Sequence, residues 1–148
     1  MIFLKKPRNF VSHHEGVGCF VEADGKILQL LRANRPGKFE SNKWGSPAGG
    51  IDAKETPLKA MARELKEEIG LSVLLGQLNF VTKVYVHYKS PYKCKFIYYL
   101  FHLLLPYPPE IRLSDEHTAS IWIPPHLANT LALVQDQFEC IKLVYALY

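Results

Sequence analysis

The sequence lacks any run of apolar residues long enough to cross a membrane as a helix, which argues against a helical membrane protein. The segment 1–10 mixes basic with apolar side chains. It lacks the longer apolar core and the small-residue cleavage site of a secretory signal. A cytoplasmic protein without membrane association is therefore expected.

Cysteine is scarce and shows no pairing pattern. Cys19, Cys94 and Cys140 are odd in number and far apart, and no C-x-x-C pair of the kind that binds zinc is present. The first two lie in strand-like runs and the third in a helix-like run. We therefore expect three buried, reduced thiols, with no local motif that would support a nucleophilic cysteine.

No block of lysine and arginine dominates the chain, and its net charge is only +4 with a pI near 8.9. This balance gives no reason to expect nucleic-acid binding, although it is compatible with a small anionic substrate. Repeats, low-complexity tracts and linkers are also absent. The chain is therefore interpreted as one domain, residues 1–148, with a core over about 14–147.

Strand-like runs rich in β-branched and aromatic residues occupy much of the chain, and Asp24-Gly25 forms a predicted hairpin turn between the first two. We predict strands at residues 16–23, 26–32, 43–47, 78–88, 93–105 and 120–123. A polar loop at 35–42 and a short connection at 89–92 separate some of them. With a helix in the middle of the chain and another at 131–147, the pattern indicates a mixed α/β sandwich.

The central helix is predicted at 57–69. Thr56 is a suitable N-cap, Pro57 fits the first helical position, and Gly70 is a suitable end. An apolar stripe repeats at helical spacing along one face. It comprises Leu58, Met61, Ala62, Leu65 and Ile69.

The charges on this helix are segregated. With Leu58 at zero, Glu67, Glu64 and Glu68 lie at about 180°, 240° and 280°, whereas the basic residues take the other flank. Glu64 and Glu68 repel each other at i,i+4, and acidic residues near a helix C-terminus oppose its dipole. A bound divalent cation would reverse both penalties, and oxygen ligands favour Mg²⁺ or Mn²⁺. Taken by itself, the acidic triple would more often be a solvated face.

The loop before the helix favours the metal interpretation. Ala48-Gly49-Gly50 lets the backbone turn tightly and approach a ligand, and an acidic loop follows it. Between Gly49 and Leu71, the sequence then matches the pattern G-x5-E-x7-R-E-U-x-E-E-x-G-U, where U is aliphatic. It matches at every fixed and aliphatic position. This segment resembles the complete Nudix box, and the strand order from about Gly16 onward is similar to a Nudix domain.

The resemblance implies a fold, a reaction and roles for individual residues. The fold is a single-domain α/β/α sandwich with a mixed sheet. The glutamates Glu64, Glu67 and Glu68 would hold Mg²⁺ or Mn²⁺, helped by the backbone carbonyl near Ala48 or Gly49. Arg63 would orient the glutamates, with Glu55 as its partner. Glu64 is the first candidate for the catalytic base and Glu67 the second.

Residues outside the box extend this hypothesis. Glu116 is a candidate for a further metal ligand or base, and adjacent His117 is more often structural at such a position. Arg32, Arg35 and Lys43 could each contact phosphate or simply belong to a solvated loop. Five tyrosines crowd the middle strands and the connection between them, and one of them could stack on a nucleobase. They are Tyr85, Tyr88, Tyr92, Tyr98 and Tyr99.

Three functions are compared. The leading one is Mg²⁺- or Mn²⁺-dependent hydrolysis of a pyrophosphate bond in a nucleoside diphosphate linked to a group X. The sequence does not decide whether the substrate is a nucleoside triphosphate, a dinucleoside polyphosphate or a sugar nucleotide. A Nudix-fold nucleotide sensor without catalysis is the alternative, although such modules usually lose box glutamates. A diphosphate isomerase on this fold would need a cysteine and a glutamate opposite each other across an isoprenoid pocket, and no cysteine here lies in a supporting motif. The expected partner is a small nucleotide-type substrate, not a nucleic acid, and a homodimer is left open.

Overall fold

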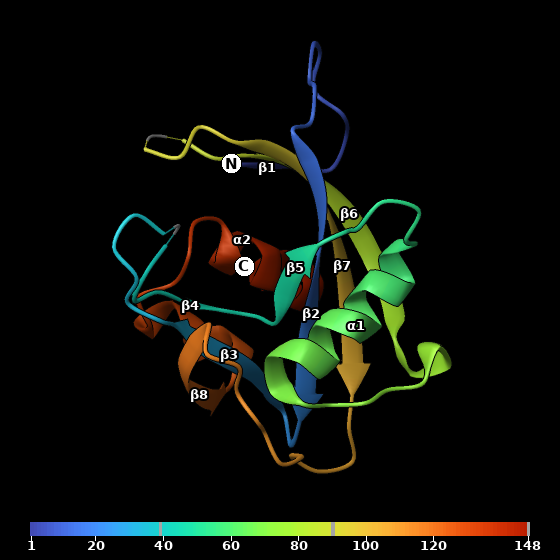
Figure 1. The fold of residues 1–148 in the computed structure, drawn as a ribbon, viewed down its shortest axis with the longest axis vertical. Coiled ribbons are helices and arrows are strands. Elements are labelled where there is room, and N and C mark those ends of the chain that lie inside the picture. Colours follow the sequence, from blue (N-terminus) through green and yellow to red (C-terminus); the bar gives the residue numbers. More distant parts are fainter. Residues whose placement is uncertain (39, 90, 148) are drawn as a thin grey trace.

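The computed structural model describes residues 1–38, 40–89 and 91–147. Its centre is a mixed sheet in which two long strands, β2 (His14–Ala23) and β7 (Lys95–Leu104), run parallel (Figure 1). The strand order is β1-β6-β7-β2-β3-β4, with β5 paired to β2 and β8 to β3. The remaining bounds are β1 (Ile2–Phe3), β3 (Lys26–Arg32), β4 (Trp44–Gly45), β5 (Ala48–Gly50), β6 (Asn79–His87) and β8 (His117–Ile123).

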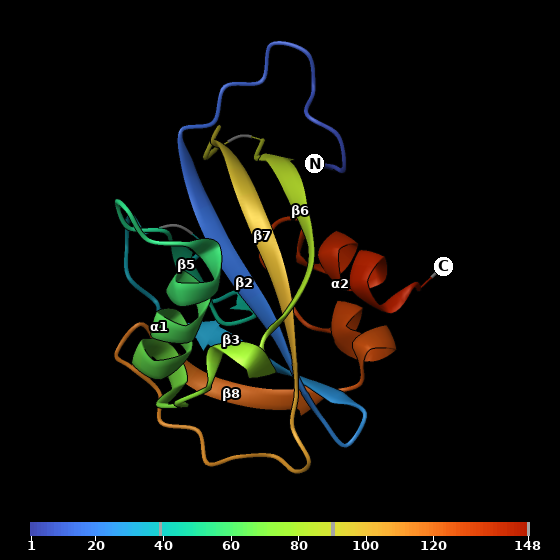
Figure 2. The same ribbon diagram turned by 90° about the vertical axis from the view of Figure 1, so that its right-hand side faces the viewer.

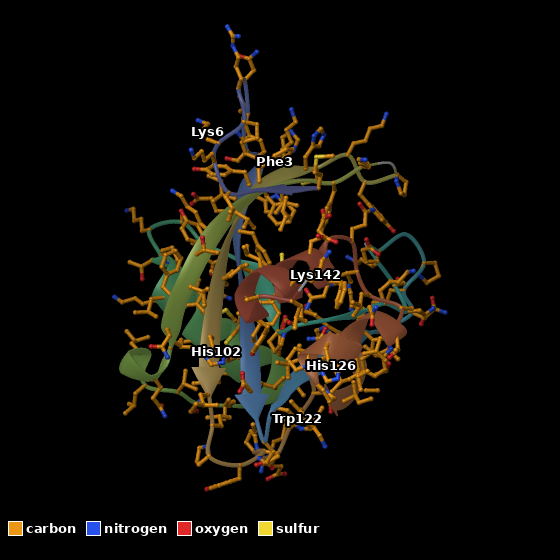
Figure 3. The ribbon with its side chains drawn as sticks, turned by 180° about the vertical axis from the view of Figure 1, so that it is seen from behind. Phe3, Lys6, His102, Trp122, His126 and Lys142 are labelled. Atoms are coloured by element: carbon orange, nitrogen blue, oxygen red, sulfur yellow. The ribbon has the colours of Figure 1, made fainter. Side chains whose placement is uncertain are left out.

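Two helices cover opposite faces of this sheet, as Figure 2 shows: α1 (Pro57–Ile69) lies on one side and α2 (Gln137–Tyr145) on the other. The short 3-10 helices are η1 (Leu75–Gln77) and η2 (Pro125–Thr130). Seen from behind in Figure 3, His126 of η2 and Lys142 of α2 mark the face away from α1. The predicted α/β/α sandwich is therefore confirmed. In the described part of the chain, no helix has the length and apolar character needed to span a membrane.

Each helix packs against a separate hydrophobic cluster on its face of the sheet. Met61, Leu65 and Ile69 of α1 are fully buried against the sheet in one cluster, and Ile141 of α2 belongs to a second cluster on the far face. Burying such a side chain contributes roughly 1.5–3 kcal/mol to the stability of the fold. Apolar side chains therefore pack against both faces of the sheet. The central strands thus lie between two apolar clusters.

Local signals explain why α1 has the predicted bounds. The Thr56 hydroxyl accepts a hydrogen bond from the Lys59 N–H at 3.2 Å, and Pro57 occupies the first turn. Gly70 ends the helix with φ 70°, a left-handed conformation that favours glycine. The buried face differs from the predicted stripe, because Leu58 and Ala62 are only half-buried whereas Glu64 and Glu68 are buried. The segment around β5 covers this acidic flank.

The predicted bounds of several other helices and strands were wrong. The C-terminal helix begins at Gln137 instead of residue 131. Residues before it run extended beside β4, where the Trp44 N–H donates to the Ala132 carbonyl at 2.8 Å, and Asp136 then adopts φ 62°. The predicted strand 43–47 shrinks to β4, and the strand predicted at 120–123 already begins at His117. The predicted connection 89–92 includes Ser90, which lies outside the described residues.

The cysteines agree only in part with the prediction. Cys19 and Cys140 are free and buried, but Cys94 is free and partly exposed, because it lies near the start of β7 at the edge of a cavity. Burial raises the pKa of the Cys140 thiol to about 12, and it also raises the pKa of Cys94. Burial raises the pKa of Cys19 as well, and a raised pKa disfavours the thiolate, which is the nucleophilic form.

Candidate active site

Gly49 lies directly against the carboxylate of Glu64. A Cβ atom added to Gly49 would stand 2.1 Å from Glu64 Cδ, far inside van der Waals contact. At the neighbouring Gly50, an added Cβ would meet nothing within 4 Å. Glycine at position 49 therefore lets β5 close over α1, and this contact fixes the Glu64 side chain against the strand.

Arg63 holds the acidic loop and the helix together. Its Nε donates to Glu55 Oε2 at 2.8 Å and its Nη2 to Glu55 Oε1 at 2.9 Å, a two-point ion pair. Its Nη1 donates to Glu64 Oε1 at 2.8 Å and to Glu67 Oε2 at 3.3 Å. Its Nη2 also reaches the Gly50 carbonyl at 2.9 Å. One guanidinium thus ties three carboxylates to β5.

These contacts have opposite effects on the carboxylates. The hydrogen bonds from Arg63, and then the Asp52 N–H, lower the pKa of Glu55 to about 2. Burial raises the pKa of Glu64, although Arg63 opposes that effect. Glu67 lies at the exposed end of the network, with 57% of its side chain accessible.

Glu68 is the most deeply buried of the box glutamates. Its Oε2 accepts the Ala48 N–H at 3.0 Å, and only 4% of the residue is exposed. Burial raises its pKa to about 8 despite this hydrogen bond, and the charges of Glu64 and Glu116 contribute in the same direction. A nearby cation would stabilise the ionised form.

The segment entering β8 brings two further side chains to Glu68. Ligand atoms of Glu68, Glu116 and His117 all lie within 4.8 Å of one another. His117 is buried, and burial followed by the charge of Arg32 lowers the pKa of its imidazole to about 4. Together with Glu64 and Glu67, this donor set is rich in carboxylate oxygens and fits a hard divalent cation.

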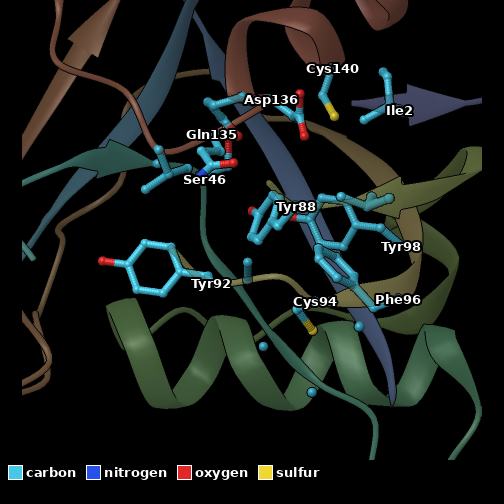
Figure 4. A pocket seen from close by; sticks show the side chains of 18 of the residues that line it. Ile2, Ser46, Tyr88, Tyr92, Cys94, Phe96, Tyr98, Gln135, Asp136 and Cys140 are labelled. Atoms are coloured by element: carbon cyan, nitrogen blue, oxygen red, sulfur yellow. Dashed lines mark hydrogen bonds between the residues drawn. The ribbon is translucent and has the colours of Figure 1, made fainter. Parts of the chain in front are cut away.

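A cavity of about 480 Å³ opens beside this group. Figure 4 shows the rings of Tyr88, Phe96 and Tyr98 gathered on one side, with Asp136 and Cys140 on another. The Phe96 ring packs edge-on against Tyr88 at 5.2 Å and against Tyr98 at 5.7 Å between centroids. Gly49, Arg32 and His117 also line the cavity, and His117 is the residue that the cavity shares with the acidic group. Its size suits one small organic ligand.

The family model for the NUDIX domain matches residues 12–144, which is most of the chain. The chain belongs to the NUDIX family. The loop and helix at Gly49–Leu71, first singled out by their spacing, are the part of this NUDIX domain in which β5, Arg63 and the glutamates meet.

Sequence relatives match only part of the chain. An RNA pyrophosphohydrolase from Halorhodospira halophila is 37% identical over 68 residues, which is 46% of this chain and 34% of that protein. A second RNA pyrophosphohydrolase, from Psychrobacter cryohalolentis, is 46% identical over 63 residues, or 43% of this chain and 35% of that protein. The matched segment thus spans about a third of these relatives.

Similarity in structure extends much further. The Escherichia coli dihydroneopterin triphosphate pyrophosphohydrolase superposes with a TM-score of 0.72 and 23% identity, covering 93% of this chain and 100% of that one. At this level of identity, the likeness shows a shared fold.

The structure separates the predicted phosphate-binding residues. Arg32 lines the cavity of this NUDIX domain, next to His117. Arg35 instead donates to the Asp115 carbonyl at 2.7 Å and lies 3.4 Å from the Asp115 carboxylate, on the exposed loop. Lys43 is half-buried just before β4 and does not line the cavity described above.

Sequence reasoning missed most of the cavity. Asp136 and Gln135 line it just before α2, in a segment that was predicted to be helical. Tyr88, Tyr92 and Tyr98 also line it, and their crowding in the sequence was the only signal of an aromatic site there. No local motif marks Asp136, because its position depends on the left-handed turn before α2 and on pairing with β4.

Proposed function

We propose that this NUDIX protein hydrolyses a phosphoanhydride bond in a substrate built on a nucleoside diphosphate linked to a group X. The observation that carries the proposal is the close fit of Gly49, Glu64 and Arg63, with Glu68 buried beside them. A structural helix would gain nothing from burying Glu64 and Glu68 on one flank.

The carboxylates of Glu64, Glu67, Glu68 and Glu116 would hold Mg²⁺ or Mn²⁺. When bound, such a cation supplies positive charge that neutralises a pyrophosphate and favours attack by water. The buried donor set supports this assignment, because burial raises the pKa of Glu68 to about 8 and a nearby cation would favour its ionised form. The backbone carbonyl near Ala48 or Gly49, in β5, would be a further oxygen donor.

The remaining roles follow from the side chains. Glu64 is our first candidate to accept the proton of the attacking water, because burial makes its carboxylate more basic while Arg63 keeps it oriented. Glu67 is the second candidate, since it is exposed and in contact with Arg63. Arg63 and Glu55 act as positioning residues, because their two-point pair fixes the guanidinium between β5 and α1.

The cavity would hold the nucleoside part of the substrate. Its aromatic wall offers faces for stacking a base, which contributes about 1–3 kcal/mol per base in comparable sites. Arg32 lines this cavity and its charge acts on Glu68, so it could contact a phosphate. The RNA pyrophosphohydrolase relatives add the 5′-triphosphate end of RNA to the candidate substrates.

A substrate panel tests this proposal. Nucleoside triphosphates, dinucleoside polyphosphates, sugar nucleotides and a 5′-triphosphorylated oligoribonucleotide are incubated with Mg²⁺ or Mn²⁺, and phosphate is measured after coupling to a phosphatase. We expect turnover of at least one class and none in the presence of a chelator. Absence of turnover across the whole panel with either metal would contradict the proposal.

A further inference from the structure

His117 occupies an unusual position in β8. In the ladder between β3 and β8, Leu31 pairs with Ala119 and Arg32 with His117, so Thr118 is an extra residue and forms a bulge. In a regular ladder Thr118 would pair with Arg32. The bulge therefore turns His117 to the side of Arg32, and both residues line the cavity.

The Nδ1 atom of the His117 imidazole has no hydrogen-bond partner among the described residues. Only 8% of His117 is exposed. Among the described residues, its Nδ1 is the one buried side-chain nitrogen or oxygen that lacks a hydrogen-bond partner. Leaving a buried polar atom unpaired is energetically unfavourable, which is a reason to look for a ligand.

The side chains around His117 indicate what that ligand is. A nitrogen of His117 and carboxylate oxygens of Glu68 and Glu116 lie within 4.8 Å of one another. Ligands of a six-coordinate ion with bonds near 2.1 Å lie about 3.0–4.3 Å apart, so small rotations would bring these atoms to ligand distance. Backbone contacts hold the segment in place: the Ala33 N–H donates to the Glu116 carbonyl at 2.9 Å, and the His117 N–H to the Ser114 carbonyl at 3.3 Å.

We propose that His117 joins Glu68 and Glu116 as a direct ligand of a divalent cation, giving this NUDIX site one nitrogen donor among oxygens. The inference rests on the proposed function, because Glu68 belongs to both. Mg²⁺ strongly prefers oxygen ligands, whereas Mn²⁺ and later transition metals also accept imidazole. The site should therefore favour Mn²⁺ over Mg²⁺ more strongly than an all-carboxylate site would.

Electron paramagnetic resonance on the full chain tests the ligand directly. Mn²⁺ is added to the metal-free protein, binding is followed by loss of the free-ion signal, and electron spin-echo modulation detects coupling to ¹⁴N. We expect this coupling in the parent protein and its loss in His117→Gln. We also expect His117→Gln to weaken Mn²⁺ binding about tenfold or more, with less than about a threefold change for Mg²⁺.

His14→Gln is the matched control, because His14 lines the same cavity but stacks on Phe96 at 5.0 Å and lies outside the acidic group. It should keep the ¹⁴N coupling. Mn²⁺ bound by the parent without ¹⁴N coupling would overturn the role of His117 and leave the proposed function standing. Absence of any Mn²⁺ or Mg²⁺ binding would overturn both. The measurement on the parent does not depend on folding of a variant.

Discussion

The two sides of β5 differ in chemistry and in how the chain builds them. On the α1 side, one continuous stretch, Gly49–Leu71, supplies Arg63 and a group of carboxylates joined by short ion pairs. On the other side, aromatic and apolar residues from β1, β2, β6, β7 and α2 surround a cavity. Under the proposed function, bond cleavage belongs to the α1 side and substrate selection to the cavity, so a change on one side should affect the role of the other side less.

The largest effect is expected for Glu64→Gln on the α1 side. The variant loses the charge that helps to hold a cation and the carboxylate proposed to accept a proton. We expect kcat to fall at least about a thousandfold, or about 4 kcal/mol, with a smaller change in KM. Steady-state kinetics would measure this, with Glu139→Gln on the exposed surface of α2 as the control. A loss of less than tenfold would remove Glu64 from the mechanism.

A paired glycine experiment tests the geometry of the same side. In Gly49→Ala the new Cβ would overlap Glu64 Cδ and displace that carboxylate, so we expect about a hundredfold fall in kcat. Gly50→Ala adds the same atom where nothing lies within 4 Å, so its kcat should fall by about tenfold or less. Equal losses in the two variants would mean that the closeness of β5 and Glu64 is unimportant. Thermal unfolding shows whether either variant is destabilised.

The pH dependence of stability tests the burial of Glu68. Its folded-state pKa is raised to about 8, so the metal-free folded protein binds more protons than the unfolded chain between about pH 4.5 and 8. Stability from this group is therefore lost as the pH rises through that window. Glu68→Gln should remove the contribution of this group to the loss, while that of Glu64 remains, and should be more stable than the parent at pH 9 by on the order of a few kcal/mol. Thermal melts with a chelator at a series of pH values measure the stability of both proteins. Parallel curves of stability against pH would contradict the raised pKa of Glu68.

The smallest effect is expected on the cavity side. Tyr88→Ala removes one aromatic face, and we expect KM to rise about tenfold while kcat changes by less than about threefold. Tyr107→Ala, at a site that is 70% exposed and distant in the sequence, is the control. Should kcat fall as steeply as in Glu64→Gln, the division between cleavage and selection would fail.

Sequence reasoning predicted the α1 side well because its determinants are local. Thr56, Pro57 and Gly70 set the helix ends through contacts within a few residues, and the helical spacing groups the three glutamates. The burial of Glu68 was not foreseen, since it depends on the Ala48 N–H and on β5 lying over the helix. The roles of these residues in catalysis stay predictions.

The cavity side could not be predicted for the opposite reason. Its residues come from segments more than a hundred positions apart, such as Ile2 and Cys140. The apolar run 131–147 was interpreted as one helix, but its first part pairs with Trp44 instead. The bulge that places His117 on the side of Arg32 also depends on register with β3, for which the sequence carries no local signal.

The most direct test of the central claim compares turnover with binding in two proteins. The parent and a Glu67→Gln/Glu68→Gln double variant are titrated with each nucleotide of the panel by calorimetry, and hydrolysis is followed with Mg²⁺ or Mn²⁺. We predict that the parent binds and cleaves at least one nucleotide, whereas the double variant cleaves none at a rate within a thousandfold of the parent. A parent protein that binds nucleotides as the variant does, with no cleavage of any, would instead be a sensor and would contradict the account.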